Sequence, residues 1–148
     1  MSEKSYKFYG WEGAPEKVRR LYDLLSEIWC VETCAPRLRQ KWSRENKTCG
    51  QCSITAFLVQ DILGGDVYGI PLPDGSVHCY NVVGETLFDL TSEQFDPKFR
   101  DGSSEPGKLR YENNPLQSRE VHFAKEEKRL RYELLKGRLQ EILPKDFK

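Results

Sequence analysis

Three residues of this sequence have the side chains of a nucleophilic active site: Cys52, His78 and Asp89. A cysteine attacks as its thiolate, whereas a free thiol is mostly protonated at neutral pH. A neighbouring imidazole can take the thiol proton, and a carboxylate can fix the tautomer of that imidazole. The trio predicts hydrolysis or transfer at an amide, ester or thioester carbonyl, with Cys52 as nucleophile, His78 as general base and then acid, and Asp89 as the group that orients the imidazole.

The nucleophile is expected in the first turn of a buried helix. The segment CGQCSITAFLVQDILGG has apolar residues on nearly every side of a helix, which is typical of a helix inside a core. The first turn of a helix carries unpaired backbone N–H groups and partial positive charge, which favour a thiolate and can hold an oxyanion. We expect the backbone N–H of Cys52 and the side chain of Gln51 or Asn46 to hold that oxyanion.

His78 and Asp89 are expected on neighbouring strands. The segments DVYGIPL, SVHCYNVV and ETLFDL are short and bounded by turn residues, which predicts an antiparallel meander. With residues 84–85 as a two-residue turn, the numbers of facing residues sum to 169. His78 and Asp89 then lie on one face as diagonal neighbours, whereas a one-residue change of register would separate them.

Helices are expected on both sides of this unit. Apolar residues at helical spacing predict one helix that begins near Pro15 and ends near Cys30, and another over about residues 124–143. Residues 101–107 are expected to form a loop. We therefore predict an α+β fold in which a central buried helix packs on a small antiparallel sheet, with flanking N- and C-terminal helices. Residues 1–13 form an N-terminal arm, and residues 14–148 form a single domain.

Composition limits the partners that this chain can have. The 148 residues include 23 basic and 23 acidic side chains, so the formal net charge is zero and a globally basic nucleic-acid binder is not indicated. No apolar run approaches the length of a membrane span, and the N-terminus lacks the apolar core of a signal peptide. We expect a soluble cytoplasmic protein without a cofactor that acts on a small molecule or peptide, with neither a membrane nor a nucleic acid as partner.

Two non-catalytic alternatives use other features of the sequence. Cys30, Cys34, Cys49 and Cys52 can supply four thiolates to a structural zinc ion, which would exclude Cys52 as a nucleophile. The segment from Arg37 to Lys47 carries five basic residues and one acidic residue around Trp42, which suits a small module that binds an anionic partner.

Four segments resemble a known family. The stretch GQCSITAFLVQDILGGDVY, then HCYN, DLTSEQF and RYELLKGRL, are similar in order to motifs of the YunG-like family of small bacterial proteins, over roughly residues 20–140. The resemblance places Gln51, Cys52, His78, Asn81 and Asp89 on motif positions and implies that Asn81 belongs to the substrate or oxyanion side of the site. The family has a second aromatic residue where this chain has a cysteine directly after the histidine.

The order of cysteine, histidine and aspartate also resembles papain-like and transglutaminase-like cysteine enzymes. Residues 49–52 are similar to the papain Cys-Gly-x-Cys, and Asn46 lies six residues before Cys52, where papain-like enzymes carry an oxyanion-hole glutamine. The resemblance implies a papain-like or transglutaminase-like core. His78 follows Cys52 by only 26 residues, a far shorter spacing than in papain, so we expect a compact core without a deep cleft.

Overall fold

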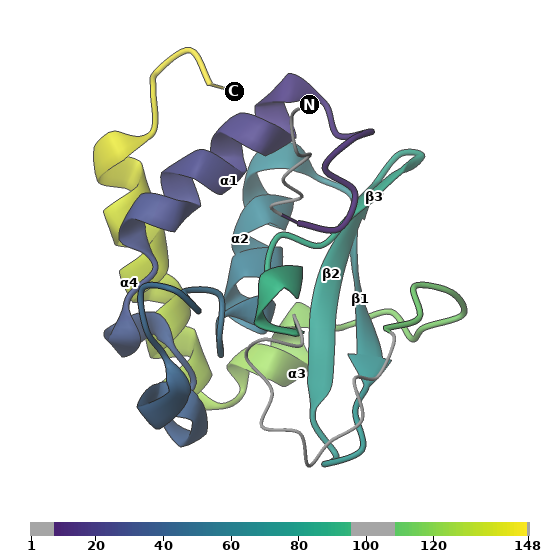
Figure 1. The fold of residues 1–148 in the computed structure, drawn as a ribbon, viewed down its shortest axis with the longest axis vertical. Helices are drawn as coiled ribbons and strands as arrows, with labels where there is room; N and C mark the ends of the chain where they lie inside the picture. The colour runs from purple at the N-terminus through teal and green to yellow at the C-terminus, as the bar shows by residue number, and fades with distance from the viewer. Residues whose placement is uncertain (1–7, 96–108, 148) are drawn as a thin grey trace, which may run out of the picture.

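The chain forms a single α+β domain with its central helix between two layers. The computed structural model describes residues 8–95 and 109–147, so the expected loop at 101–107 and the first seven residues of the expected arm lie outside the described residues. Figure 1 shows helix α2, Cys52–Leu63, with the sheet on one side and helices α1 and α4 on the other. This arrangement confirms the predicted α+β class with a buried helix packed on a small antiparallel sheet, while the papain-like or transglutaminase-like core stays a prediction.

The flanking helices follow the apolar spacing of the sequence. Helix α1 covers Glu16–Ile28 and α4 covers Glu126–Ile142, preceded by the short helix α3 at Arg119–Phe123. Within residues 8–95 and 109–147, 3-10 helices occupy connecting segments: η1 at Val31–Thr33, η2 at Pro36–Lys41 and η3 at Ser92–Phe95.

The sheet is the predicted meander in the predicted register. Strands β1 (Asp66–Pro71), β2 (Val77–Val83) and β3 (Thr86–Phe88) are antiparallel in the order β1-β2-β3. In the second hairpin Val83 faces Thr86, so facing residue numbers sum to 169 as expected. Strand β3 ends at Phe88, and the next residue, Asp89, pairs with Tyr9 instead of continuing along β2.

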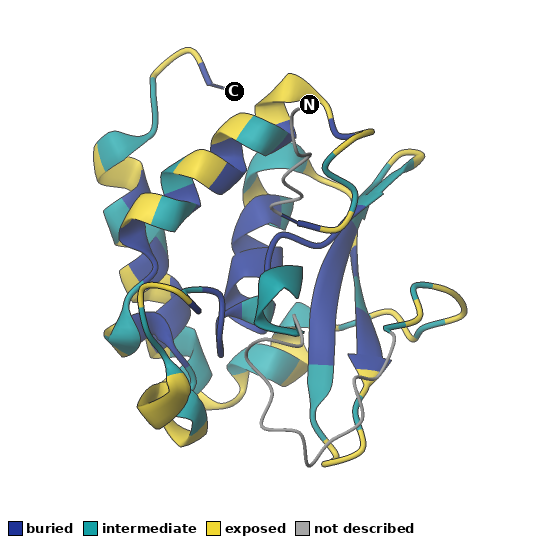
Figure 2. Cartoon of the chain, viewed as in Figure 1, coloured by how far each residue is buried: buried dark blue, intermediate teal, exposed yellow. Residues whose placement is uncertain are grey.

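Helix α2 lies in the core because it offers no polar face. All residues from Ser53 to Val59 are buried, and Figure 2 shows the helix in dark blue over most of its length. The apolar stripe of α1 and the inner side of α4 pack in the same core, which contains Leu21, Leu25, Leu135 and Leu139.

The described part of the predicted N-terminal arm belongs to the fold. Phe8 is buried against Trp11 and Tyr22. The backbone of Tyr9 accepts a hydrogen bond from the N–H of Asp89 at 3.0 Å. Across residues 8–95 and 109–147, no helix combines the length and apolar character needed to cross a bilayer. The expected cytoplasmic location stays a prediction.

Candidate functional site

Cys52 is the first residue of helix α2, as predicted, and Gly50 shapes the backbone in front of it. Gly50 has φ +72°, a left-handed conformation that side chains rarely adopt. A Cβ at this position would lie 2.5 Å from the sulfur of Cys34 and 2.8 Å from the backbone nitrogen of Ala35. Only glycine allows this close turn, which delivers the half-buried Cys52 at the helix N-terminus.

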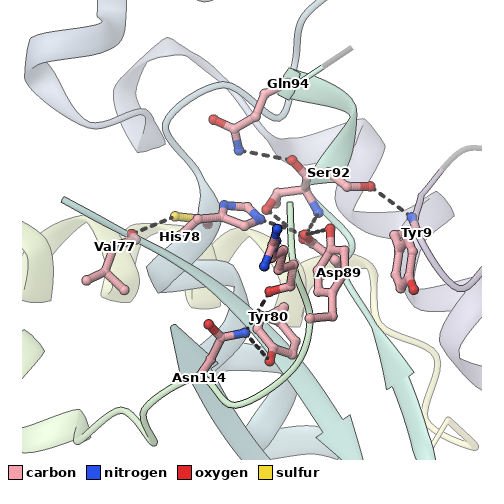
Figure 3. Close-up of polar contacts among 12 residues, drawn as sticks. Tyr9, Val77, His78, Tyr80, Asp89, Ser92, Gln94 and Asn114 are labelled. Atoms are coloured by element: carbon pink, nitrogen blue, oxygen red, sulfur yellow. Dashed lines mark hydrogen bonds and ion pairs between the residues drawn. The ribbon is translucent and has the colours of Figure 1, made fainter. Parts of the chain in front are cut away.

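His78 and Asp89 form the hydrogen bond that the register allowed. The His78 Nε2 lies 2.6 Å from the Asp89 Oδ2, and both side chains are at most 1% exposed. Figure 3 shows the imidazole and the carboxylate pointing toward each other from the sheet and from the segment after β3. Because this pair is closed to solvent, the charge interaction is screened far less than on a surface.

Further donors surround the Asp89 carboxylate. The Tyr111 hydroxyl donates to Oδ2 at 2.7 Å. The Thr91 backbone N–H and hydroxyl donate to Oδ1 at 3.2 and 3.4 Å. A buried carboxylate requires such partners, since burial without hydrogen bonds is costly. Tyr111 was not predicted as a site residue, because nothing in its local pattern indicates contact with a residue 22 positions earlier.

The Cys52 sulfur lies at the start of strand β2, 3.8 Å from the carbonyl oxygen of Val77. A hydrogen bond from the Cys79 thiol and the neighbouring His78 imidazole lower the pKa of Cys52 well below the usual range, against the opposing effect of burial. Both contacts favour the thiolate form of Cys52.

The His78 imidazole is held in its charged form. Burial by itself lowers the pKa of His78, but the charge and hydrogen bond of Asp89, with a smaller contribution from Cys52, raise the pKa to about 10. The second ring nitrogen, Nδ1, is buried and has no hydrogen bond of normal geometry among the described residues. One imidazole thus lies between a carboxylate and a sulfur.

Helix η3 connects the two halves of this site. The Gln94 side chain accepts from the Gly50 N–H at 3.3 Å and donates to the Thr91 carbonyl at 3.0 Å. It therefore links the turn before Cys52 to the segment after Asp89, as Figure 3 shows in part. The Phe95 ring lies edge-on to His78, with centroids 4.7 Å apart.

Two of the three expected oxyanion amides are engaged elsewhere. The Gln51 Nε2 donates to the Cys30 carbonyl at 3.1 Å, and the Asn81 Nδ2 donates to the Ala56 carbonyl at 2.9 Å. Both amides thereby serve the packing of α2. Asn46 is the remaining side-chain candidate, together with the backbone N–H groups of the first helical turn.

Buried polar atoms without partners gather around the same turn. Among the described residues these are Asn46 Oδ1, Thr48 Oγ1, Gln51 Oε1 and His78 Nδ1. Three belong to the six residues before Cys52, and the fourth faces the site from β2. Because native proteins leave few such atoms unpaired, their concentration here is a mark of a functional region.

The four-cysteine zinc site is not assembled in the part of the chain that the structure describes, where no three or more His, Cys, Asp or Glu residues are grouped to hold a metal ion. The cysteines instead form pairs: Cys34 hydrogen-bonds Cys49, and Cys52 hydrogen-bonds Cys79. Thiol pairs of this kind lack the four-fold arrangement that structural zinc requires.

The basic segment around Trp42 is partly neutralised within the chain. Arg37 forms an ion pair with Asp74 at 3.6 Å, and Lys47 forms one with Glu93 at 3.4 Å. The Arg39 guanidinium donates to two backbone carbonyls. These contacts do not favour the anion-binding module.

The fold and this constellation define an α+β protein with a cysteine sulfur, an imidazole and a carboxylate grouped near the start of its central helix. The chain belongs to the YunG family, whose family model, described as "YunG protein", matches residues 17–144. A Bacillus subtilis (strain 168) protein named "Uncharacterized protein YunG" is 44% identical over 55 residues, which are 37% of this chain and 47% of that protein. The match thus spans about half the length of the curated relative. No solved structure matches the chain.

Proposed function

We propose that this protein is a cysteine-nucleophile hydrolase or acyltransferase that acts on an amide, ester or thioester carbonyl. The observation that carries this proposal is the position of one buried imidazole, which binds the Asp89 carboxylate through Nε2 and adjoins the Cys52 sulfur. Geometry of this kind supports nucleophilic catalysis, in which nucleophile, base and orienting group act in sequence.

The resting state that we infer is an ion pair. The lowered pKa of Cys52 and the pKa of about 10 for His78 support a thiolate beside an imidazolium at neutral pH. The sulfur therefore needs no base at the moment of attack. His78 begins the cycle as the acid, which refines the order of roles expected from the sequence.

The reaction follows from these charges. The Cys52 sulfur forms a bond to the substrate carbonyl carbon, and the developing oxyanion is stabilised by N–H groups in the first turn of α2. His78 then gives its proton to the leaving group, which departs and leaves a thioester on Cys52. The neutral imidazole next takes a proton from water or another acceptor, whose attack releases the acyl group and restores the thiolate.

The papain-like or transglutaminase-like core expected from the sequence is part of this proposal. The order of Cys52, His78 and Asp89 along the chain and the resemblance of residues 49–52 support it. The pairing of Gln51 and Asn81 with backbone carbonyls gives the oxyanion role to the backbone and to Asn46.

Thiol labelling tests the ion pair. Iodoacetamide should modify Cys52 well below pH ~8.5, where an ordinary thiol reacts slowly. The variant His78→Ala should lose this advantage, while His122→Ala, which removes the other histidine of the chain, should keep it. Equal and slow labelling of all five cysteines would remove the proposal.

Turnover of an activated ester tests the enzyme assignment. With p-nitrophenyl acetate, the wild type should form an acetyl adduct on Cys52 that is visible by mass spectrometry and that then hydrolyses. Cys52→Ser should form neither adduct nor product above background. If Cys52 is acetylated but the adduct does not hydrolyse, the assignment as a hydrolase is contradicted. Transfer of the acetyl group from Cys52 to an added amine or thiol would then identify an acyltransferase.

A further inference from the structure

Cys79 lies on the side of strand β2 that faces helix α2. The Asn81 amide reaches the Ala56 carbonyl of α2 at 2.9 Å, so residue 81 points toward the helix. Side chains alternate along a strand, so Cys79 shares this side and His78 points to the other. The Cys52 sulfur lies 3.8 Å from the carbonyl oxygen of Val77, two residues before Cys79 on the same strand, and is hydrogen-bonded to the Cys79 thiol.

The two thiols differ in exposure and in protonation. Cys79 is 1% exposed, while Cys52 is half-buried. The hydrogen bond to Cys52 and burial raise the pKa of Cys79 well above the usual range, so Cys52 is the first of the two to ionise. A partly exposed cysteine with a lowered pKa beside a protected thiol is the arrangement of a redox-active cysteine pair.

We propose that Cys52 and Cys79 form a dithiol–disulfide pair in which hydroperoxides oxidise Cys52 and Cys79 closes the disulfide. This inference shares the activated Cys52 sulfur with the proposed function but needs no acyl chemistry. It assigns to Cys79 a role that the hydrolase or acyltransferase reaction does not use.

The oxidation proceeds in two balanced steps. The Cys52 thiolate attacks one oxygen of hydrogen peroxide, an S–O bond forms, and the O–O bond breaks. The sulfur is oxidised to sulfenic acid while the peroxide is reduced to hydroxide, which takes a proton from the His78 imidazolium. The Cys79 thiol then attacks the Cys52 sulfur, the S–S bond forms, the S–O bond breaks, and water leaves with the Cys79 proton.

The disulfide has a direct consequence for the site. Its sulfur is no longer a thiolate, so oxidation should stop alkylation and ester turnover at Cys52, and a dithiol reductant should restore both. Cys34 and Cys49 form a second hydrogen-bonded pair, but both are buried, at 0% and 5% exposure. Peroxide should therefore reach the Cys52 pair first.

Peptide mapping after peroxide treatment tests the proposal. With one equivalent of hydrogen peroxide, the wild type should lose two free thiols and the mass of two hydrogen atoms, with Cys52 and Cys79 linked. Cys79→Ala should not form this link and should give a dimedone adduct on Cys52, because sulfenic acid then persists. Cys30→Ser, which lies outside both pairs, should behave as the wild type.

Three results would overturn the inference. A link only between Cys34 and Cys49 would show that the wrong pair was chosen. A dimedone adduct on Cys52 of the wild type as strong as in Cys79→Ala would show that Cys79 does not close the bond. Fast alkylation of Cys52 without disulfide formation refutes this inference and leaves the proposed function standing. If the disulfide forms but the fully reduced protein shows no ester turnover, the proposed function is refuted instead.

Discussion

Replacing Asp89 by asparagine should uncouple Cys52 from its imidazolium. The Asp89 Oδ2 lies 2.6 Å from the His78 Nε2, and an amide in its place removes the charge that offsets the burial of the ring. Without that charge the pKa of His78 should fall from about 10 to its ordinary 6.5 or below. At about 1.4 kcal/mol per pKa unit, the imidazolium loses roughly 5 kcal/mol of stabilisation.

The effect on Cys52 appears in the pH dependence of alkylation. The wild type should label at a nearly constant rate across neutral pH, because its thiolate is already formed. In Asp89→Asn the hydrogen bond from Cys79 remains but the imidazolium is lost, so the inflection should move up by at least about one pH unit. Below that inflection the rate should rise about tenfold per pH unit.

The control and the stability check accompany this measurement. Tyr111→Phe removes one hydrogen bond to Asp89 but keeps the charge, so it should keep the wild-type labelling profile. The new amide leaves a buried donor unpaired, which should cost about 1–3 kcal/mol, or a Tm lower by about 3–10 °C. A folded Asp89→Asn protein with the wild-type profile would refute the reasoning.

Two further predictions concern the turn before Cys52 and the two histidines. Gly50→Ala should destabilise the fold by about 2–5 kcal/mol, because φ +72° is strained for alanine and its Cβ would meet the Cys34 sulfur. Gly64 has φ +81° but open space where a Cβ would lie, so Gly64→Ala should lower the free energy of unfolding only by the backbone strain of alanine. Denaturant unfolding compares the two variants. Equal decreases in the free energy of unfolding would contradict the packing argument. At pH ~7 imidazole nitrogen NMR should show His78 charged and His122 neutral, because burial and then the Lys128 charge lower the pKa of His122 to about 4. The two pKa shifts change the free energy of unfolding in opposite directions with pH. The contribution of His122 is complete above pH 6.5 and is lost as the pH falls toward about 4. The contribution of His78 is complete below pH 6.5 and is lost as the pH rises toward about 10. A His78 signal that titrates near 6.5 would contradict the ion pair.

Local pattern was enough to predict the elements that carry the site. An all-round apolar segment predicted the buried helix that starts at Cys52, because a helix without a polar face must be covered on every side. The turn at residues 84–85 predicted the hairpin register, since strand side chains alternate with a fixed period of two. The paired residues of that hairpin end at Asn81 and Phe88, and the next residue, Asp89, pairs with Tyr9 and lies within hydrogen-bond reach of His78.

The contacts that tune the site were decided by tertiary packing. The Tyr111 hydroxyl on Asp89, the Phe95 ring on His78 and the Cys79 thiol on Cys52 each join segments whose local patterns say nothing of one another. The same packing drew the cysteines into pairs rather than into the four-ligand set that their spacing allowed. The spacing of residues along a chain determines the face of the helix or strand on which a side chain lies. The packing of α2 on the sheet determines which distant group that side chain contacts.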